Sequence, residues 1–130
     1  MDNLIPEGIV VENGREIARF CFGGSAYVGL EVLFRGRSHG SMFLAGGSCF
    51  LLLGRLGKLP LLPRALAGAG VITAVELATG LVFNRDHRVW DYRELPLNFL
   101  GQICLPFSLL WIPVGLGATA LYGQMKTGDA

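Results

Sequence analysis

Two carboxylates, Glu31 and Glu76, lie inside apolar segments of the chain. An ionised carboxylate at the centre of a membrane helix costs roughly 2.5–3.5 kcal/mol even on the mildest insertion scale. Each glutamate is therefore expected to face the interior of a helix bundle, to find a partner, or to hold a proton. Glu76 is deeper in its segment, and we interpret it as a candidate proton or cation site. The alternative is an ion pair with an arginine near the membrane interface, for which the candidates are Arg35, Arg64 and Arg85.

Helical spacing supports an inward orientation for both glutamates. Glu31 shares one helical face with three residues spaced i, i+4 and i+7 along the same segment, namely Phe20, Gly24 and Tyr27. Glu76 shares a face with Ala69, Thr73 and Gly80 in the same way. Small and polar residues of this kind are typical of contacts between membrane helices.

Two amides, Asn98 and Gln102, are spaced i, i+4 near the start of the last apolar segment. If that segment is helical throughout, both amides lie on one face, and buried amides require hydrogen-bond partners. We expect them to bond Glu76 across a helix interface or to line a polar cavity. Pro106 and Pro113 in the same segment are expected to kink the helix.

A polar loop between residues 84 and 96 concentrates charged residues beside two aromatic ones. Its candidate functional residues are Asn84, Trp90, Asp91, Tyr92 and Pro96. The first loop lies on the same side of an up-and-down bundle, so its residues Arg35 and His39 are added to this group. Trp and Tyr are typical of the membrane–water interface. We expect a surface cap held by ion pairs, or a surface that binds lipid phosphates or a partner protein. The histidine and acid spacing matches no metal motif, and no metal ligand is assigned.

The elements that position these residues follow from the distribution of charge. From Leu95 to Met125 there are 31 consecutive positions without a charged residue, more than the ~20 that a spanning helix requires. The sequence predicts an all-α membrane protein, a four-transmembrane-helix bundle with short loops and with spans at about 17–34, 40–57, 65–83 and 97–122. Residues 1–16, which lack the basic start of a signal peptide, are expected to form an N-terminal surface segment, and residues 123–130 a C-terminal tail.

Composition excludes several classes of protein. Of the 130 residues, 52% are hydrophobic and only 16% are charged, which argues against disorder and against an ordinary soluble domain. The 11 basic and 10 acidic residues leave no positive surface for nucleic acid. No nucleotide-binding loop and no nucleophile–base pair is visible, so neither an enzyme nor a cofactor is predicted. Basic residues divide six to five between the two sides, a weak bias that leaves dual insertion open.

A combined motif in the second half of the chain resembles a known family. It comprises the intramembrane Glu76, then Trp90-Asp91-Tyr92, Pro96-Leu97-Asn98 and Gly101-Gln102-Ile103-Cys104. The chain is similar, over about residues 22–116, to the putative ABC-transporter type IV membrane protein family of bacteria. It departs from the family pattern at Arg93, where Ser is common, and at Gly40, where an aromatic residue is common.

The resemblance implies a multi-pass protein of the bacterial cytoplasmic (inner) membrane that acts as a transporter component without its own ATPase. We expect contact with the lipid bilayer and either a homo-oligomer or a separate partner subunit. Two alternatives stay open: a stand-alone proton-coupled small exporter acting as a homodimer, and a structural or regulatory membrane protein that transports nothing. The substrate is not predicted.

Overall fold

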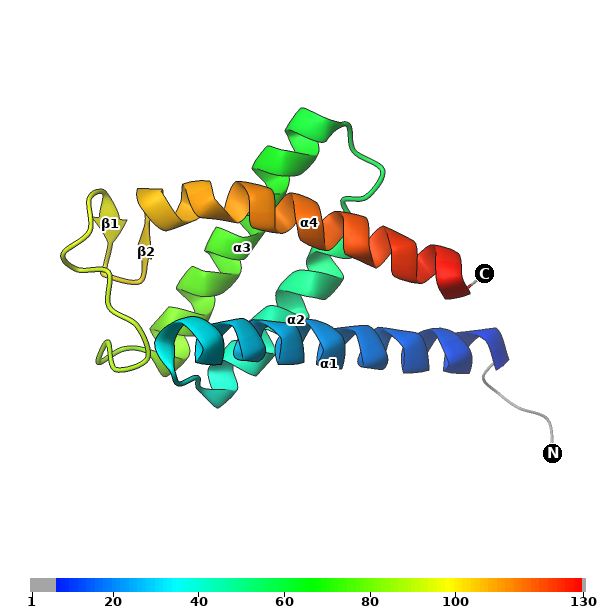
Figure 1. The fold of residues 1–130 in the computed structure, drawn as a ribbon, viewed down its shortest axis with the longest axis horizontal. Helices are drawn as coiled ribbons and strands as arrows, with labels where there is room; N and C mark the ends of the chain where they lie inside the picture. Colours follow the sequence, from blue (N-terminus) through cyan, green and yellow to red (C-terminus); the bar gives the residue numbers. More distant parts are fainter. Residues whose placement is uncertain (1–6, 130) are drawn as a thin grey trace.

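The chain folds into four helices and one small hairpin, in a computed structural model that describes the backbone of residues 7–129 and the side chains of residues 14–126. The elements are α1 (Glu7–Arg35), α2 (Gly40–Gly54), α3 (Leu61–Phe83), β1 (Asn98–Phe99), β2 (Ile103–Cys104) and α4 (Leu105–Asp129). The two strands pair antiparallel, with Asn98 opposite Cys104. The predicted all-α, four-helix architecture is confirmed (Figure 1).

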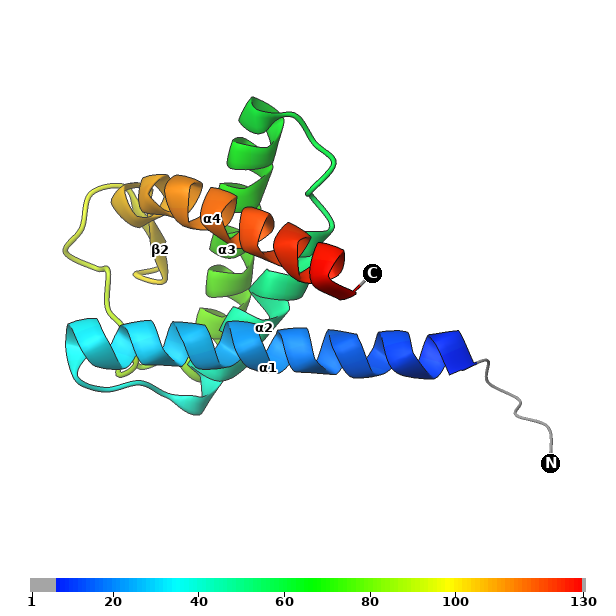
Figure 2. The same cartoon turned by 45° about the vertical axis from the view of Figure 1, so that its right-hand side comes forward.

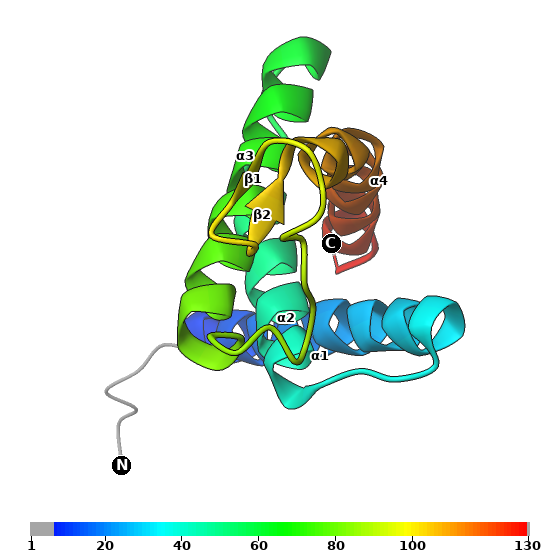
Figure 3. The same ribbon diagram turned by 90° about the vertical axis from the view of Figure 1, so that its left-hand side faces the viewer.

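The helices alternate in direction along the long axis of the molecule. In Figures 1 and 2, α1 and α4 run lengthwise in opposite directions, and α2 and α3 run obliquely across that direction. The start of α1 and the end of α4 therefore lie at one end of the molecule. The first loop and the β1–β2 hairpin lie together at the other end, which faces the viewer in Figure 3.

Many large apolar side chains face outward, and several polar side chains are buried together with the apolar core. Leu33 and Phe34 are 81% and 85% exposed, and many other large apolar residues are also exposed. The buried side chains include Arg19, Glu76 and Asn84. A surface of this kind fits lipid rather than water. Three helical stretches, 14–35, 61–83 and 105–126, are long and apolar enough to cross a membrane, while the apolar α2 has 15 residues.

Glycines allow the helices to approach closely. A Cβ atom on Gly46 of α2 would lie 2.7 Å from Tyr27 Cβ and 2.8 Å from the carbonyl oxygen of Gly23, both in α1. Gly68 of α3 and Gly115 of α4 also face each other, although a Cβ on Gly115 would make only an ordinary contact, 3.6 Å from Gly68 Cα. Small residues at helix contacts are the usual means by which membrane helices pack.

Several predicted helix limits are wrong. The predicted surface segment 1–16 contains the start of α1, which begins at Glu7, while residues 1–6 lie outside the described part of the chain. Helix α2 ends at Gly54 instead of about residue 57, because residues 55–58 form turns with Arg55 N bonded to Leu52 O at 3.1 Å. Helix α3 begins at Leu61 rather than 65, and α4 continues past 122 to Asp129, so that the predicted tail is largely helical.

The largest difference concerns the fourth predicted span. Helix α4 begins at Leu105 and not at residue 97, because residues 98–104 form the β1–β2 hairpin. Pro106 consequently lies in the first turn of α4, where its missing N–H is not needed, and the kink predicted there is not required. Pro113 does lie inside the helix.

Candidate functional site

Glu76 is a buried carboxylate held by two neutral donors. Its side chain in α3 is only 9% exposed. The Tyr92 hydroxyl donates a hydrogen bond to Glu76 Oε2 at 2.8 Å, and the Trp111 indole N–H donates to Glu76 Oε1 at 3.3 Å. Among the described residues no lysine or arginine forms an ion pair with Glu76, so the arginine partner considered as an alternative is not found.

Glu31 differs from Glu76 because it has a cationic partner. Arg35, one turn later in α1, donates through Nη1 to Glu31 Oε2 at 2.9 Å. The other terminal nitrogen of Arg35 donates to the carbonyl oxygen of Val89 in the third loop. Glu31 therefore has the kind of arginine partner that was considered for both glutamates. Because Arg35 also bonds Val89, it links the end of α1 to the third loop.

Both glutamates line one cavity of about 190 Å³ among the four helices. Its wall is mostly aliphatic and aromatic, with six aromatic side chains: Phe22, Tyr27, Phe50, Trp90, Tyr92 and Trp111. The charged residues in the wall are Glu31, Glu76 and Arg35. Two acids and one arginine give the cavity wall a formal charge of −1 when both acids are ionised.

A second, polar cleft of about 290 Å³ lies between the first and third loops. It is lined by Arg37, His39, Asp86, Arg88 and others, and it shares Glu31, Arg35 and Met42 with the aromatic cavity. The Glu31–Arg35 ion pair therefore stands between the two spaces. Arg35, His39 and residues of the third loop line this same cleft, as expected if they lie on one face of the bundle.

Asn98 and Gln102 do not occupy the positions predicted for them. They lie in the β1–β2 hairpin, so they do not share a helical face, and neither is hydrogen-bonded to Glu76. Asn98 closes a local turn: its amide donates to the carbonyl oxygen of Leu95 at 3.0 Å, and its own oxygen accepts from Gly101 N at 3.0 Å. Pro96 precedes Leu97, whose φ of 52° lies in the left-handed region.

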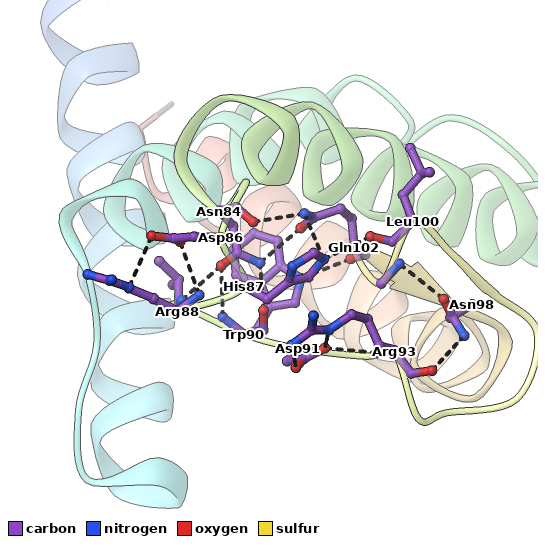
Figure 4. Close-up of polar contacts among 12 residues, drawn as sticks. Asn84, Asp86, His87, Arg88, Trp90, Asp91, Arg93, Asn98, Leu100 and Gln102 are labelled. Carbon is purple, nitrogen blue, oxygen red and sulfur yellow. Dashed lines mark hydrogen bonds and ion pairs between the residues drawn. The ribbon is translucent and has the colours of Figure 1, made fainter.

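A buried network around Asn84 shapes the third loop (Figure 4). Asn84 is 0% exposed. Its amide donates to Trp90 O at 2.7 Å and to Gln102 Oε1 at 2.9 Å, and its oxygen accepts from Val89 N and Trp90 N. Gln102 in turn donates to Asn84 O at 2.8 Å, and its backbone carbonyl accepts from the Trp90 indole at 2.9 Å. All four hydrogen-bonding positions of the Asn84 side chain are used.

The segment Trp90-Asp91-Tyr92 alternates between inside and outside, as an extended chain does. Trp90 and Tyr92 point into the cavity wall, while Asp91 is exposed and pairs with Arg93 at 2.6 Å. The hydrogen bond from the Arg93 side chain lowers the pKa of Asp91 to about 2. The motif thus positions Tyr92 on Glu76 and leaves an ion pair at the surface.

His39 caps α2, since its Nδ1 accepts from Ser41 N at 3.1 Å. Within the described residues no group of three or more His, Cys, Asp or Glu side chains could hold a metal ion.

Sequence reasoning missed Trp111. This residue is 7% exposed, donates to Glu76, and lies 6.5 Å from Tyr27 between ring centroids. The available signal was an indole N–H in the middle of an apolar run, where it needs an acceptor.

These features define a multi-pass membrane protein with an internal, aromatic, acid-bearing cavity. Residues 30–126 match the model of the family described as "Putative ABC-transporter type IV". The match covers most of the chain, and the protein belongs to this family. Searches of curated proteins and of solved structures found no match.

Proposed function

We propose that this chain is the membrane-embedded component of a transporter and that the cavity between its helices receives the solute. The observation that carries the proposal is Glu76, a carboxylate 9% exposed in the wall of a cavity of about 190 Å³ without an arginine or lysine partner in the described structure. Acids inside membrane proteins commonly mark substrate or ion pathways. Family membership supports the same assignment.

The proposed route runs from the surface through the polar cleft into the aromatic cavity. A solute would enter the polar cleft between the first and third loops, pass the Glu31–Arg35 ion pair, and reach Glu76 in the aromatic cavity. Arg35 also bonds Val89 O in the third loop, so a movement of that loop would disturb the ion pair. The pair is a candidate gate.

The chain itself is assigned neither an enzymatic step nor a cofactor. It contains no glycine-rich nucleotide-binding loop, so ATP hydrolysis is assigned to a separate polypeptide. We place the complex in the bacterial cytoplasmic membrane, with the chain acting as an oligomer or with a partner subunit.

The test compares membrane vesicles from native-host cells that carry the wild-type gene, a deletion, or the Glu76→Gln variant. Glutamine can retain both hydrogen bonds, because its oxygen accepts from Trp111 and its amide donates to the Tyr92 hydroxyl. Solutes accumulated with ATP are compared by mass spectrometry with those accumulated with a non-hydrolysable analogue. We expect at least one ATP-dependent solute that both the deletion and Glu76→Gln abolish.

The matched control is Glu94→Gln, which removes a carboxylate from an exposed position in the third loop. It is expected to transport like the wild type, and membrane insertion of every variant is checked by detergent extraction and size-exclusion chromatography. Full activity of inserted Glu76→Gln would contradict the proposal. Identical solute profiles in wild type and deletion would favour the structural or regulatory role, and accumulation driven by a proton gradient without ATP would favour the stand-alone exporter.

A further inference from the structure

We infer that the cavity binds a small monovalent organic cation, with an ammonium head beside Glu76 and an apolar body against the aromatic wall. This inference rests on the proposed function, because it names the class of solute that the same cavity takes. It is carried by the charge, the chemistry and the size of the cavity.

The charge of the wall favours a single positive charge. Arg35 compensates Glu31 through its 2.9 Å ion pair, which leaves Glu76 as the uncompensated acid. Tyr92 and Trp111 donate hydrogen bonds to Glu76, and neutral donors orient a carboxylate without cancelling its charge. A buried charge without a counter-charge is strongly unfavourable. A proton or a monovalent cation would restore neutrality, and an organic cation would displace the proton, whereas an anion would be repelled.

The lining favours an organic cation over a metal ion. Calcium and magnesium require about six or more oxygen ligands at close range. The cavity offers few oxygens in addition to the carboxylates, and its wall is mainly aliphatic and aromatic. Aromatic faces attract ammonium groups that have lost their water, and tryptophan and tyrosine are the most effective. Trp90, Trp111, Tyr27 and Tyr92 all contribute to this wall.

The size of the cavity limits the body of the cation. A cavity of about 190 Å³ is slightly larger than the ~150 Å³ apolar cavity that accommodates one benzene molecule. It is smaller than the ~300–1,000 Å³ typical of sites for drug-sized ligands. One aromatic ring with a methylated ammonium group, as in benzyltrimethylammonium, is therefore a suitable probe.

The two tryptophans of the chain provide a direct assay. The sequence contains two Trp residues, Trp90 and Trp111, and both line the cavity. Intrinsic fluorescence of the full chain in lipid nanodiscs therefore reports on this site. Benzyltrimethylammonium is titrated beside its neutral isostere neopentylbenzene and the anion benzenesulfonate, with protein-free nanodiscs correcting for partition into lipid.

We expect saturable binding of the cation to the wild type and at least tenfold weaker binding to Glu76→Gln. The neutral isostere is expected to bind wild type and variant within about twofold of each other, and Glu94→Gln is expected to bind the cation like the wild type. Cation affinity unchanged in Glu76→Gln would overturn the inference. A neutral isostere or an anion that binds the wild type as tightly as the cation would also overturn it, and this comparison needs no variant to fold.

Failure of this inference can be distinguished from failure of the proposed function. Vesicles that accumulate some other solute through Glu76, without cation binding, would overturn the cation site and leave the transport role. Cation binding that requires Glu76, in a protein whose deletion changes no ATP-dependent accumulation, would support the site and overturn the transport role.

Discussion

The hydrogen bond from Tyr92 to Glu76 can be removed with almost no other change. Tyr92→Phe deletes the hydroxyl that donates to Glu76 Oε2 at 2.8 Å. The ring remains stacked on Phe107, with centroids 4.7 Å apart and planes inclined by 12°. Hydrogen bonds to charged groups contribute about 1.5–3 kcal/mol, so we expect Tyr92→Phe to lower the free energy of unfolding by that amount.

The same substitution in a Glu76→Gln background tests the charge on the acceptor. There the hydroxyl would bond a neutral amide, and neutral hydrogen bonds contribute about 0.5–1.5 kcal/mol. Tyr92→Phe should therefore cost roughly 1 kcal/mol less in this background, which is about a fivefold change in the unfolding equilibrium. The difference between the two backgrounds measures the extra strength that an ionised Glu76 gives the bond.

The assay is equilibrium unfolding of the purified protein in detergent, followed by far-UV circular dichroism. Tyr122→Phe is the control, because its hydroxyl donates to Glu16 at 3.0 Å near the far end of α4. Tyr122 is 11 residues beyond Trp111, about 16 Å along a helix, and distant substitutions are usually additive. Its cost should be equal in both backgrounds. A Tyr92→Phe cost below about 0.5 kcal/mol with Glu76 present would refute the reasoning.

Three further outcomes are expected from local geometry. Gly46→Ala should lower the free energy of unfolding by about 1–3 kcal/mol in the same assay, because its Cβ would lie 2.8 Å from a backbone oxygen of α1. Gly29→Ala is the control and should cost nothing comparable, because no atom lies within 4 Å of its Cβ position. Gly101→Ala should speed hydrogen exchange in the β1–β2 hairpin, since φ is +68° there. Arg93→Gln should raise the pKa of Asp91, measured by NMR, from about 2 toward its usual 3.8. Because the pKa is lowered in the folded state, the contribution of the Asp91–Arg93 pair to stability is lost as the pH falls from 3.8 to about 2.

The helices could be predicted from the sequence because charged residues interrupt the apolar runs. Each of the four predicted spans contains most of an observed helix, and Glu31 and Glu76 both line the cavity, in keeping with the cost of a carboxylate that faces lipid. Proximity of the first and third loops followed from the alternating direction of consecutive helices. These properties depend on local composition, which is directly visible in the sequence.

The hairpin could not be predicted in the same way. Residues 97–104 are uncharged, and the absence of charge does not distinguish a helix from a hairpin. Leu97 and Leu100 adopt φ values of 52° and 56°, which leucine rarely favours and which tertiary contacts must impose. Pro106 was the overlooked local signal, since proline is common in the first turn of a helix. The partners of Glu76 depend on packing between distant segments, and spacing along one segment does not reveal them.

Consecutive helices pair into two helical hairpins, α1–α2 and α3–α4. Helix α1 packs most extensively on α2, and α3 packs most extensively on α4. Each hairpin contributes one glutamate from its first helix, and the cavity is lined by both.

The two hairpins are joined along α2, which packs on both α3 and α4, and Gly54 of α2 lies against the Tyr122 ring of α4. The hydrogen bond from Arg35 to Val89 O also joins the first hairpin to the third loop, which lies in the second. Because both hairpins line the cavity, its shape depends on how α2 seats against α3 and α4.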